Sequence, residues 1–247
     1  MDDAVIRTSY LDLQNARPEL FVNPSDGAID ILLDENEVRA AEAAAAARLR
    51  EAGQPEEWAR TGVVYEDQYF MIVRDAVRFR DGPIGTYIRE MTLEPAVGSV
   101  VLPVLDGRVV LVRHFRHADR QWHIEVPRGF ASPGATAVDN AHVELEEEIG
   151  AKAIRMVDLG LIHADAGAST DPVALFFAEI ASYGDVEAAE GISGVSLVDP
   201  GEVARMIADG RITDGFTICA YTRAVLRGLL PGPGGAAAQQ GEATAGA

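Results

Sequence analysis

Short runs of apolar residues, separated by polar and glycine-rich breaks, fill the middle of the chain and are typical of β-strands. The clearest pair flanks Asp106-Gly107, a dipeptide that favours a two-residue type I′ hairpin turn. Residues 97–105 and 108–114 are therefore predicted to pair as an antiparallel hairpin. Similar runs predict further strands at residues 63–74, 76–80, 87–91, 122–126, 157–162 and 173–180.

A different spacing, of three and four residues between apolar positions, predicts a helix over residues 136–149. Thr136 and Asp139 stand in the spacing of an N-terminal capping box, and Gly150 follows the last turn as a C-cap would. The stripe expected to face a core consists of Val138, Ala141, Leu145 and Ile149. Two later helices are predicted at residues 199–210 and 214–227.

An alanine-rich helix is predicted near the start of the chain, over residues 34–52. Its low hydrophobic bulk leaves two alternatives, a helix that lies on a surface or at a subunit contact, and a marginal helix exposed to solvent. Together the elements predict an α/β protein, an α/β/α sandwich around a mixed sheet with an N-terminal helical and β extension. The expected divisions are an extension at 1–60, a small β-rich subdomain at 61–95, the main domain at 96–230 and a disordered tail at 231–247.

The composition of the chain argues against several kinds of binding partner and site. The chain has 247 residues, 48% of them hydrophobic, and a net charge of −18, which argues against binding to nucleic acid or to an anionic membrane. Its single cysteine, Cys219, excludes an intrachain disulfide and a cysteine-rich zinc site. No apolar run is long enough to span a bilayer and no signal peptide is recognisable, so the expected location is the cytoplasm.

Three glutamates on the helix at 136–149 carry the candidate chemistry. Because successive residues are about 100° apart around a helix, Glu144, Glu147 and Glu148 fall within an arc of about 100°. Carboxylates this close repel one another and favour a bound cation, and oxygen ligands suit Mg²⁺ or Mn²⁺. Such a site predicts metal-assisted attack of water on a phosphoric anhydride. The alternative is a solvated acidic face.

The segment 129–151, G-F-A-S-P-G-A-T-A-V-D-N-A-H-V-E-L-E-E-E-I-G-A, resembles the Nudix box. The positions that agree with this pattern are Gly129, Glu144, Leu145, Glu147, Glu148, Gly150 and Ala151. Two positions depart from it, since Ala135 replaces a glutamate and Val143 replaces an arginine. The resemblance implies a Nudix-type fold and a divalent metal, Mg²⁺ or Mn²⁺. The departures raise the question of whether the box is active.

Residues 97–130 resemble the segment that leads into the box in Nudix enzymes of the ADP-ribose pyrophosphatase type. The matching residues are Arg113, Arg116, Glu125, Pro127 and Gly129. Residues 163–171 resemble a loop that contributes to substrate choice in those enzymes, although a proline common there is absent. The resemblance also implies a homodimer.

Roles follow from the resemblance residue by residue. The implied metal ligands are Glu144, Glu148, Glu147, the backbone carbonyl of Arg128 and Glu125. The catalytic candidates are Glu147, Glu148, Glu187 and Glu190, and the substrate-binding candidates are Arg116, Arg113, Arg128 and Arg89. Several alternatives stay open: Glu125 pairs with Arg128, Arg116 forms a surface ion pair, Arg128 is an exposed loop residue, and Glu187 and Glu190 belong to a flexible acidic loop.

The leading hypothesis is Mg²⁺-dependent hydrolysis of the diphosphate in a nucleoside diphosphate linked to another moiety, with ADP-ribose or a nucleotide sugar as substrate. A second hypothesis follows from Ala135 and Val143: a catalytically impaired domain that acts as a nucleotide sensor or a structural partner. A third is a different reaction on an altered box.

Overall fold

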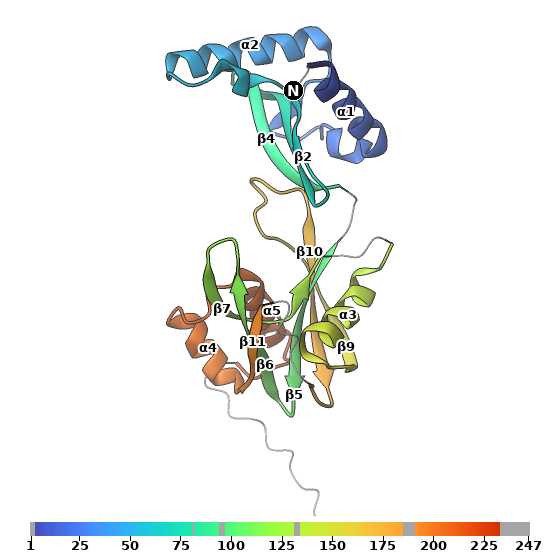
Figure 1. Ribbon diagram of the computed structural model, residues 1–247, viewed down its shortest axis with the longest axis vertical. Coiled ribbons are helices and arrows are strands. Elements are labelled where there is room, and N and C mark those ends of the chain that lie inside the picture. The colour runs from blue at the N-terminus through green and yellow to red at the C-terminus, as the bar shows by residue number, and fades with distance from the viewer. Residues whose placement is uncertain (1–2, 81, 94–96, 131–133, 185–190, 233–247) are drawn as a thin grey trace, which may run out of the picture. The chain divides into compact units, whose positions relative to one another are not determined.

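The computed structural model describes residues 3–80, 82–93, 97–130, 134–184 and 191–232, and only the backbone of residues 3–8. The chain divides into two compact units (Figure 1). The first comprises Met1–Pro95 with Asp165–Asp171, and the second comprises Ala96–Ala164 with Pro172–Ala247. Within the described ranges, no helix is both long enough and apolar enough to cross a membrane.

The first unit is a four-stranded antiparallel sheet that carries two helices. Its helices are α1 (Asp3–Ala16) and α2 (Glu35–Glu51), with the short 3-10 helices η1 (Pro18–Phe21) and η2 (Glu56–Ala59). Its strands are β1 (Ile29–Ile31), β2 (Gly62–Glu66), β3 (Phe70–Phe79) and β4 (Ile84–Thr92). The long strand β3 pairs with the other three. Helix α1, strand β1 and the two 3-10 helices were not predicted from the sequence.

Helix α2 confirms the predicted alanine-rich helix. Asp34 caps its first turn, accepting hydrogen bonds from the backbone N–H groups of Asn36 and Glu37. Ala41 is fully buried and Ala45 nearly so, and the helix contacts β3 and β4. Small side chains let a helix approach a sheet closely. The alternative of a solvent-exposed helix is therefore wrong.

The second unit is built on a seven-stranded mixed sheet in the order β11-β6-β5-β10-β9, with β7 paired to β6 and β8 paired to β5. The strands are β5 (Gly98–Leu105), β6 (Arg108–Arg116), β7 (Gln121–Glu125), β8 (Arg128–Gly129), β9 (Ala153–His163), β10 (Pro172–Ile180) and β11 (Ile192–Val198). Strands β5 and β10 are parallel, and the other described pairs are antiparallel. The helices are α3 (Ala137–Ile149), α4 (Pro200–Ala208) and α5 (Gly215–Leu226).

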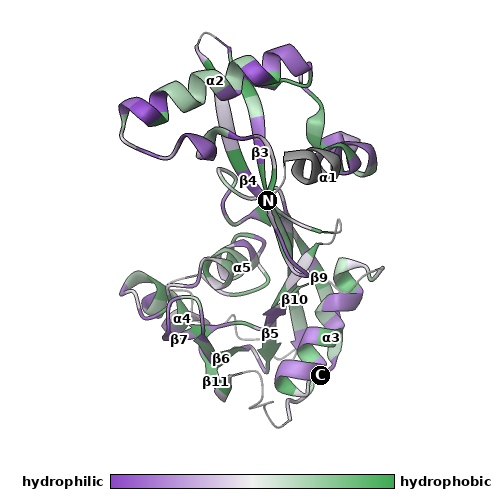
Figure 2. Ribbon diagram, turned by 45° about the horizontal axis from the view of Figure 1, so that its top comes forward, coloured by the Kyte–Doolittle hydropathy of each residue, from purple (hydrophilic) through white to green (hydrophobic). Residues whose placement is uncertain are grey.

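Helices cover both faces of this sheet, which confirms the predicted α/β/α sandwich. On one face α3 buries Ala141, Leu145 and Ile149 against β5, β6 and β10. Hydrophilic and hydrophobic residues alternate along its ribbon (Figure 2), as expected for a helix with one buried side. Val138 is 39% exposed, so the buried stripe begins one turn later than predicted.

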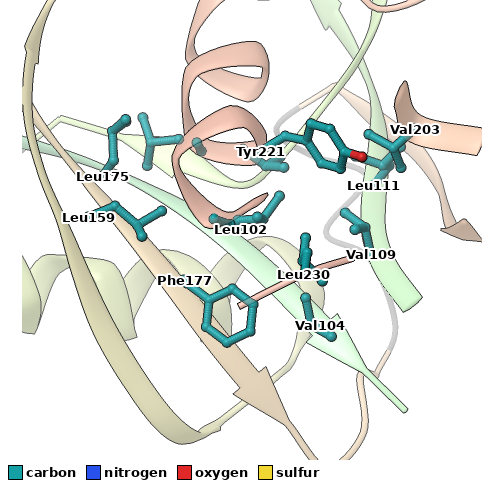
Figure 3. Packing of buried hydrophobic residues seen from close by; sticks show 14 of the residues in the cluster. Leu102, Val104, Val109, Leu111, Leu159, Leu175, Phe177, Val203, Tyr221 and Leu230 are labelled. Atoms are coloured by element: carbon teal, nitrogen blue, oxygen red, sulfur yellow. The ribbon is translucent and has the colours of Figure 1, made fainter. Parts of the chain in front are cut away.

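On the opposite face, α4 and α5 cover a second apolar cluster. Tyr221 of α5 lies beside Val203 of α4 and Leu111 of β6 (Figure 3). The Tyr221 hydroxyl donates a hydrogen bond of 2.7 Å to the carbonyl of Pro200. The buried polar tip therefore has a partner, and the two helices are joined at this point.

Local sequence signals fix several element ends as predicted. At the hairpin between β5 and β6, Asp106 and Gly107 have φ of 50° and 76°, as a type I′ turn requires. Thr136 caps α3 by accepting a hydrogen bond from the Asp139 N–H, and Gly150 ends the helix with φ of 59°. Hydrogen-bonded local geometry explains these successes.

One predicted boundary is wrong. The single strand predicted at 63–74 is broken between β2 and β3, and the predicted break near residue 75 does not exist. Asp67 accepts hydrogen bonds from the N–H groups of Tyr69 and Phe70, and this turns the chain into a hairpin. A polar turn residue inside an apolar run explains the error.

The loop at 165–171 belongs to the first unit, although it lies within the range predicted as the main domain. Glu90 of β4 donates to the carbonyl of Ala168 (2.8 Å) and accepts from the Thr170 N–H (3.1 Å). Asp171 also accepts a hydrogen bond of 2.6 Å from the Thr92 N–H. The loop thus continues the sheet of the first unit at β4, and the ranges 1–60 and 61–95 fall in the same unit.

Candidate functional site

Two glutamates of α3 converge on the short strand β8. Glu144 and Glu148 stand one turn apart and are 9% and 2% exposed. Glu148 Oε1 accepts a hydrogen bond from the backbone N–H of Arg128 (3.4 Å). The Glu144 carboxylate lies against Gly129, where an added Cβ would overlap it. Glycine at this position therefore makes room for the carboxylate.

Glu148 has electrostatic surroundings that are unusual for a carboxylate. Its Oε2 is buried and has no hydrogen-bond partner among the described residues. Burial raises the pKa of Glu148 to about 8, partly offset by the Arg128 N–H and reinforced by the charge of Glu144. A buried carboxylate oxygen without a donor, beside a second carboxylate, fits a hard divalent cation. The glutamates thus satisfy the chemistry expected of such a site.

Asn140 supports this pair from within the helix. It is buried one turn before Glu144, and its amide lies 3.5 Å from Glu144 Oε1. The sequence prediction missed this residue, although its spacing of four from Glu144 was a visible signal.

Glu147 does not join the other two glutamates. It is exposed, as are Val143 and Ala135, the two positions that depart from the box pattern. In the ranges that the structure describes, no group of three or more acidic, histidine or cysteine side chains is arranged to hold a metal ion. Two of the three predicted carboxylates are therefore brought together, and the role of Glu147 stays a prediction.

Glu125, at the end of β7, is surrounded by basic side chains instead. Arg116 contacts it through two nitrogens, Nη2 to Oε1 and Nε to Oε2 (3.2 Å). His114 Nδ1 lies 3.3 Å from Oε1, and Arg128 Nη2 lies 3.6 Å from Oε2. Arg116 therefore pairs with a carboxylate that is almost fully buried, and the alternative of a surface ion pair for Arg116 is wrong.

The Arg128 side chain is not an exposed loop arginine. Its Nη2 lies 3.2 Å from Asp214 Oδ1, and its guanidinium stacks over the Phe216 ring at 4.7 Å. Both partners belong to the start of α5. Sequence reasoning missed Asp214, because its contact with Arg128 joins residues far apart in the chain.

The remaining predicted residues lie elsewhere. Arg113 stacks on Trp122 at 4.0 Å and donates to Ser193 Oγ (3.0 Å). Since side chains alternate along a strand, Arg113 and Arg116 face opposite sides of β6. Arg89 belongs to the first unit, where it pairs with Asp75 (2.7 Å). Glu187 and Glu190 lie outside the described residues.

Comparison with known proteins defines the class. Residues 93–213 match the family model of the NUDIX domain. These residues of the chain therefore form a NUDIX domain, as the box predicted.

Within the superfamily, the similarity is to proteins that act on ADP compounds. The ADP-ribose pyrophosphatase of Bacillus subtilis (strain 168) is 28% identical over 91 residues, which are 37% of this chain and 49% of the relative. The chain thus matches about half the length of that curated relative. A solved structure described as an ADP compounds hydrolase superposes with a TM-score of 0.58 at 17% identity, over 69% of this chain and 93% of the other. This likeness shows the shared fold.

Proposed function

We propose that the chain hydrolyses the diphosphate of a nucleoside diphosphate linked to another moiety, with Mg²⁺ or Mn²⁺ as the cofactor. The observation that carries the proposal is the buried Oε2 of Glu148, which lies beside Glu144 in a NUDIX domain and has no hydrogen-bond partner in the part of the chain that the structure describes. The name of the Bacillus subtilis relative and the description of the solved structure favour ADP-ribose or another ADP compound as substrate. A nucleotide sugar is the second substrate class.

In this proposal Glu144 and Glu148 hold the cation together with the backbone carbonyl of Arg128. A bound divalent cation would activate water and neutralise the charge of the diphosphate. Glu148 would bind such a cation as the carboxylate, so binding would release its proton. The proposal gives Glu147, exposed on the same helix, the role of accepting a proton from the attacking water. Hydrolysis then yields two monophosphates.

Arg116 is the proposed contact for the diphosphate. It lies on the same strand face as His114 and supports Glu125 from one side. A planar guanidinium can bind phosphate oxygens through two N–H groups. To do so in this chain, Arg116 has to share its donors between Glu125 and the substrate.

A second candidate is a nucleotide-binding Nudix domain that does not hydrolyse its ligand. The exposure of Glu147 favours it, since only two carboxylates converge in the described structure. In this case Val143, 43% exposed, offers no charge that could orient Glu147.

Phosphorus NMR on a panel of nucleoside diphosphate derivatives, with Mg²⁺ or Mn²⁺, separates the two candidates. The hydrolase should release two monophosphates from at least one member of the panel. Calorimetric binding of a panel member without release of monophosphate would support the sensor and contradict hydrolysis.

A further inference from the structure

A buried polar network joins the start of α5 to the segment that precedes α3. Thr217 is fully buried, and its Oγ1 accepts a hydrogen bond of 3.0 Å from the backbone N–H of Val126. The same hydroxyl donates to Asp214 Oδ2 (2.7 Å), which also accepts from the Thr217 N–H (2.8 Å). The other oxygen of Asp214 lies 3.2 Å from Arg128 Nη2. Thr217 in the first turn of α5 and its N-cap residue Asp214 thus contact Val126 and Arg128 of one short segment.

That segment, residues 125–129, carries backbone and side-chain groups close to the glutamate pair. Glu125 gives its carboxylate, Arg128 gives the N–H that Glu148 accepts, and Gly129 lies against Glu144. On its other side the segment is fixed to β5, where the Val101 N–H donates to the Pro127 carbonyl (2.9 Å). The segment is therefore held between β5 and α5.

Among the described contacts, the β5 side of this attachment uses backbone groups, whereas the α5 side depends on side chains. Val126 is fully buried, so its N–H would be left without an acceptor if the Thr217 hydroxyl were removed. An unsatisfied buried donor is costly, and the segment would shift to relieve it. The Arg128 backbone would move with it, because only one residue separates it from Val126.

We propose that Thr217 and Asp214 are positioning residues that hold the 125–129 segment in register with Glu144 and Glu148. This inference rests on the proposed function, since the cation site is formed between the glutamates and the segment. Neither residue lies on the helix that carries the glutamates. Groups that support metal ligands from outside commonly change metal affinity by about 10-fold to 100-fold when they are removed.

The direct test is Mn²⁺ affinity, measured by electron paramagnetic resonance of free Mn²⁺ without substrate. Thr217→Val keeps the shape and removes the hydroxyl, so the dissociation constant should rise by about 10-fold or more. Thr217→Ser restores the acceptor and should stay within about twofold of the original protein. Tyr221→Phe removes another buried hydroxyl of α5, one that contacts Pro200 and not the segment, and should leave the affinity unchanged.

Two further measurements separate this inference from the proposed function. Asp214→Asn keeps a residue that can cap α5 but removes the charge that Arg128 contacts, so it should also weaken Mn²⁺ binding. This variant takes the place of Thr217→Val in the affinity test if Thr217→Val does not fold. Amide hydrogen exchange should be faster across 125–129 in Thr217→Val and Asp214→Asn, but not in Tyr221→Phe. If the original protein binds no Mn²⁺ yet exchange rises as described, the proposed function fails and the positioning role stands. Unchanged exchange and unchanged affinity in the folded variants would overturn the positioning role.

Discussion

Two buried carboxylates of the site, Glu125 and Glu148, have opposite surroundings. Glu125 is contacted by the guanidinium of Arg116 and by a second arginine, Arg128. Glu148 has one backbone N–H on one oxygen and no partner on the other among the described residues, and Glu144 adds negative charge beside it. The need for a cation is therefore concentrated at Glu148.

This difference predicts how stability depends on pH without metal. The pKa of Glu148 is raised by burial from its usual 4.5 to about 8, so the folded protein keeps a proton that the unfolded chain has lost between these values. The free energy of unfolding should fall as pH rises through this window, by an amount on the order of a few kcal/mol at most. Urea unfolding at several pH values, with EDTA present, measures the slope.

The control for this slope is Glu148→Gln, which removes the titrating group. All other titrating groups are shared by the two proteins, so the difference between them isolates Glu148. Mg²⁺ at pH 8 should restore stability to the original protein and not to the variant. Parallel pH curves for the two proteins would contradict the assignment.

Gly129 gives a second prediction at the scale of single residues. In Gly129→Ala the new methyl group would overlap the Glu144 carboxylate, which has to move away. Because that carboxylate is the end of a flexible side chain, we expect only a modest loss of stability but a fall in Mn²⁺ affinity of about 10-fold or more. Gly201→Ala, whose Cβ meets nothing within 4 Å, is the matched control for calorimetry. Equal Mn²⁺ affinity in both variants would refute the close fit of Glu144.

At the scale of elements, α3 holds the glutamates in place through its two ends and its buried stripe. Gly150 ends the helix in the left-handed region, and a Cβ there would stand 3.1 Å from the backbone of Gly184. Gly210 has a similar positive φ of 79° but open space around it. The two glycines therefore differ in the close approach of a neighbouring backbone.

This contrast predicts that substitution by alanine lowers the free energy of unfolding by different amounts at the two glycines. Gly210→Ala should lower the free energy of unfolding by about 1 kcal/mol, from backbone strain alone. Gly150→Ala should cost clearly more, because backbone atoms near Gly184 cannot yield as a side chain can. Urea unfolding of both variants makes the comparison, and equal losses would show that the Gly184 contact is unimportant.

Elements with local signals were predictable from the sequence, and those that depend on distant partners were not. The Asp106-Gly107 turn and the caps of α3 are specified by a few adjacent residues. Strand β11 contains Gly194 and two serines, and its place in the sheet comes from pairing with β6, more than 70 residues earlier. Its four apolar residues are interrupted by these small and polar ones, so its own sequence gives only a weak strand signal.

The same distinction holds within the site. Glu144 and Glu148 were predictable because helix geometry places them one turn apart. The partner of Glu125 was not, since the choice of Arg116 depends on how β6 pairs with β7. The exposure of Glu147 depends on which residues of α3 pack against the sheet, and helical periodicity alone does not say where that buried face ends.

At the scale of the whole molecule, the NUDIX match begins at residue 93, close to the boundary between the two units. The loop at 165–171 leaves the second unit and hydrogen-bonds with β4 of the first. The chain thus connects the two units at more than one point along its sequence. Arg89 lies in the first unit, and its role as a substrate contact stays a prediction.

The family resemblance implies a homodimer, which is a prediction about the whole molecule. Light scattering coupled to size exclusion should give a mass near twice the 26.4 kDa of the chain. A mass equal to that of one chain at micromolar concentration would exclude a stable dimer.

The central claim is that Glu148 holds a divalent cation that hydrolysis requires. The most direct measurement is the initial rate of monophosphate release from ADP-ribose as Mg²⁺ is titrated, for the original protein, Glu148→Gln and Glu146→Gln. Glu146 lies on the same helix but is exposed and pairs with Lys152 (3.2 Å), so its variant should behave as the original protein. We predict a Mg²⁺-dependent rate that Glu148→Gln lowers by at least about 100-fold. Turnover by Glu148→Gln at the original rate and with the original Mg²⁺ dependence would contradict the claim.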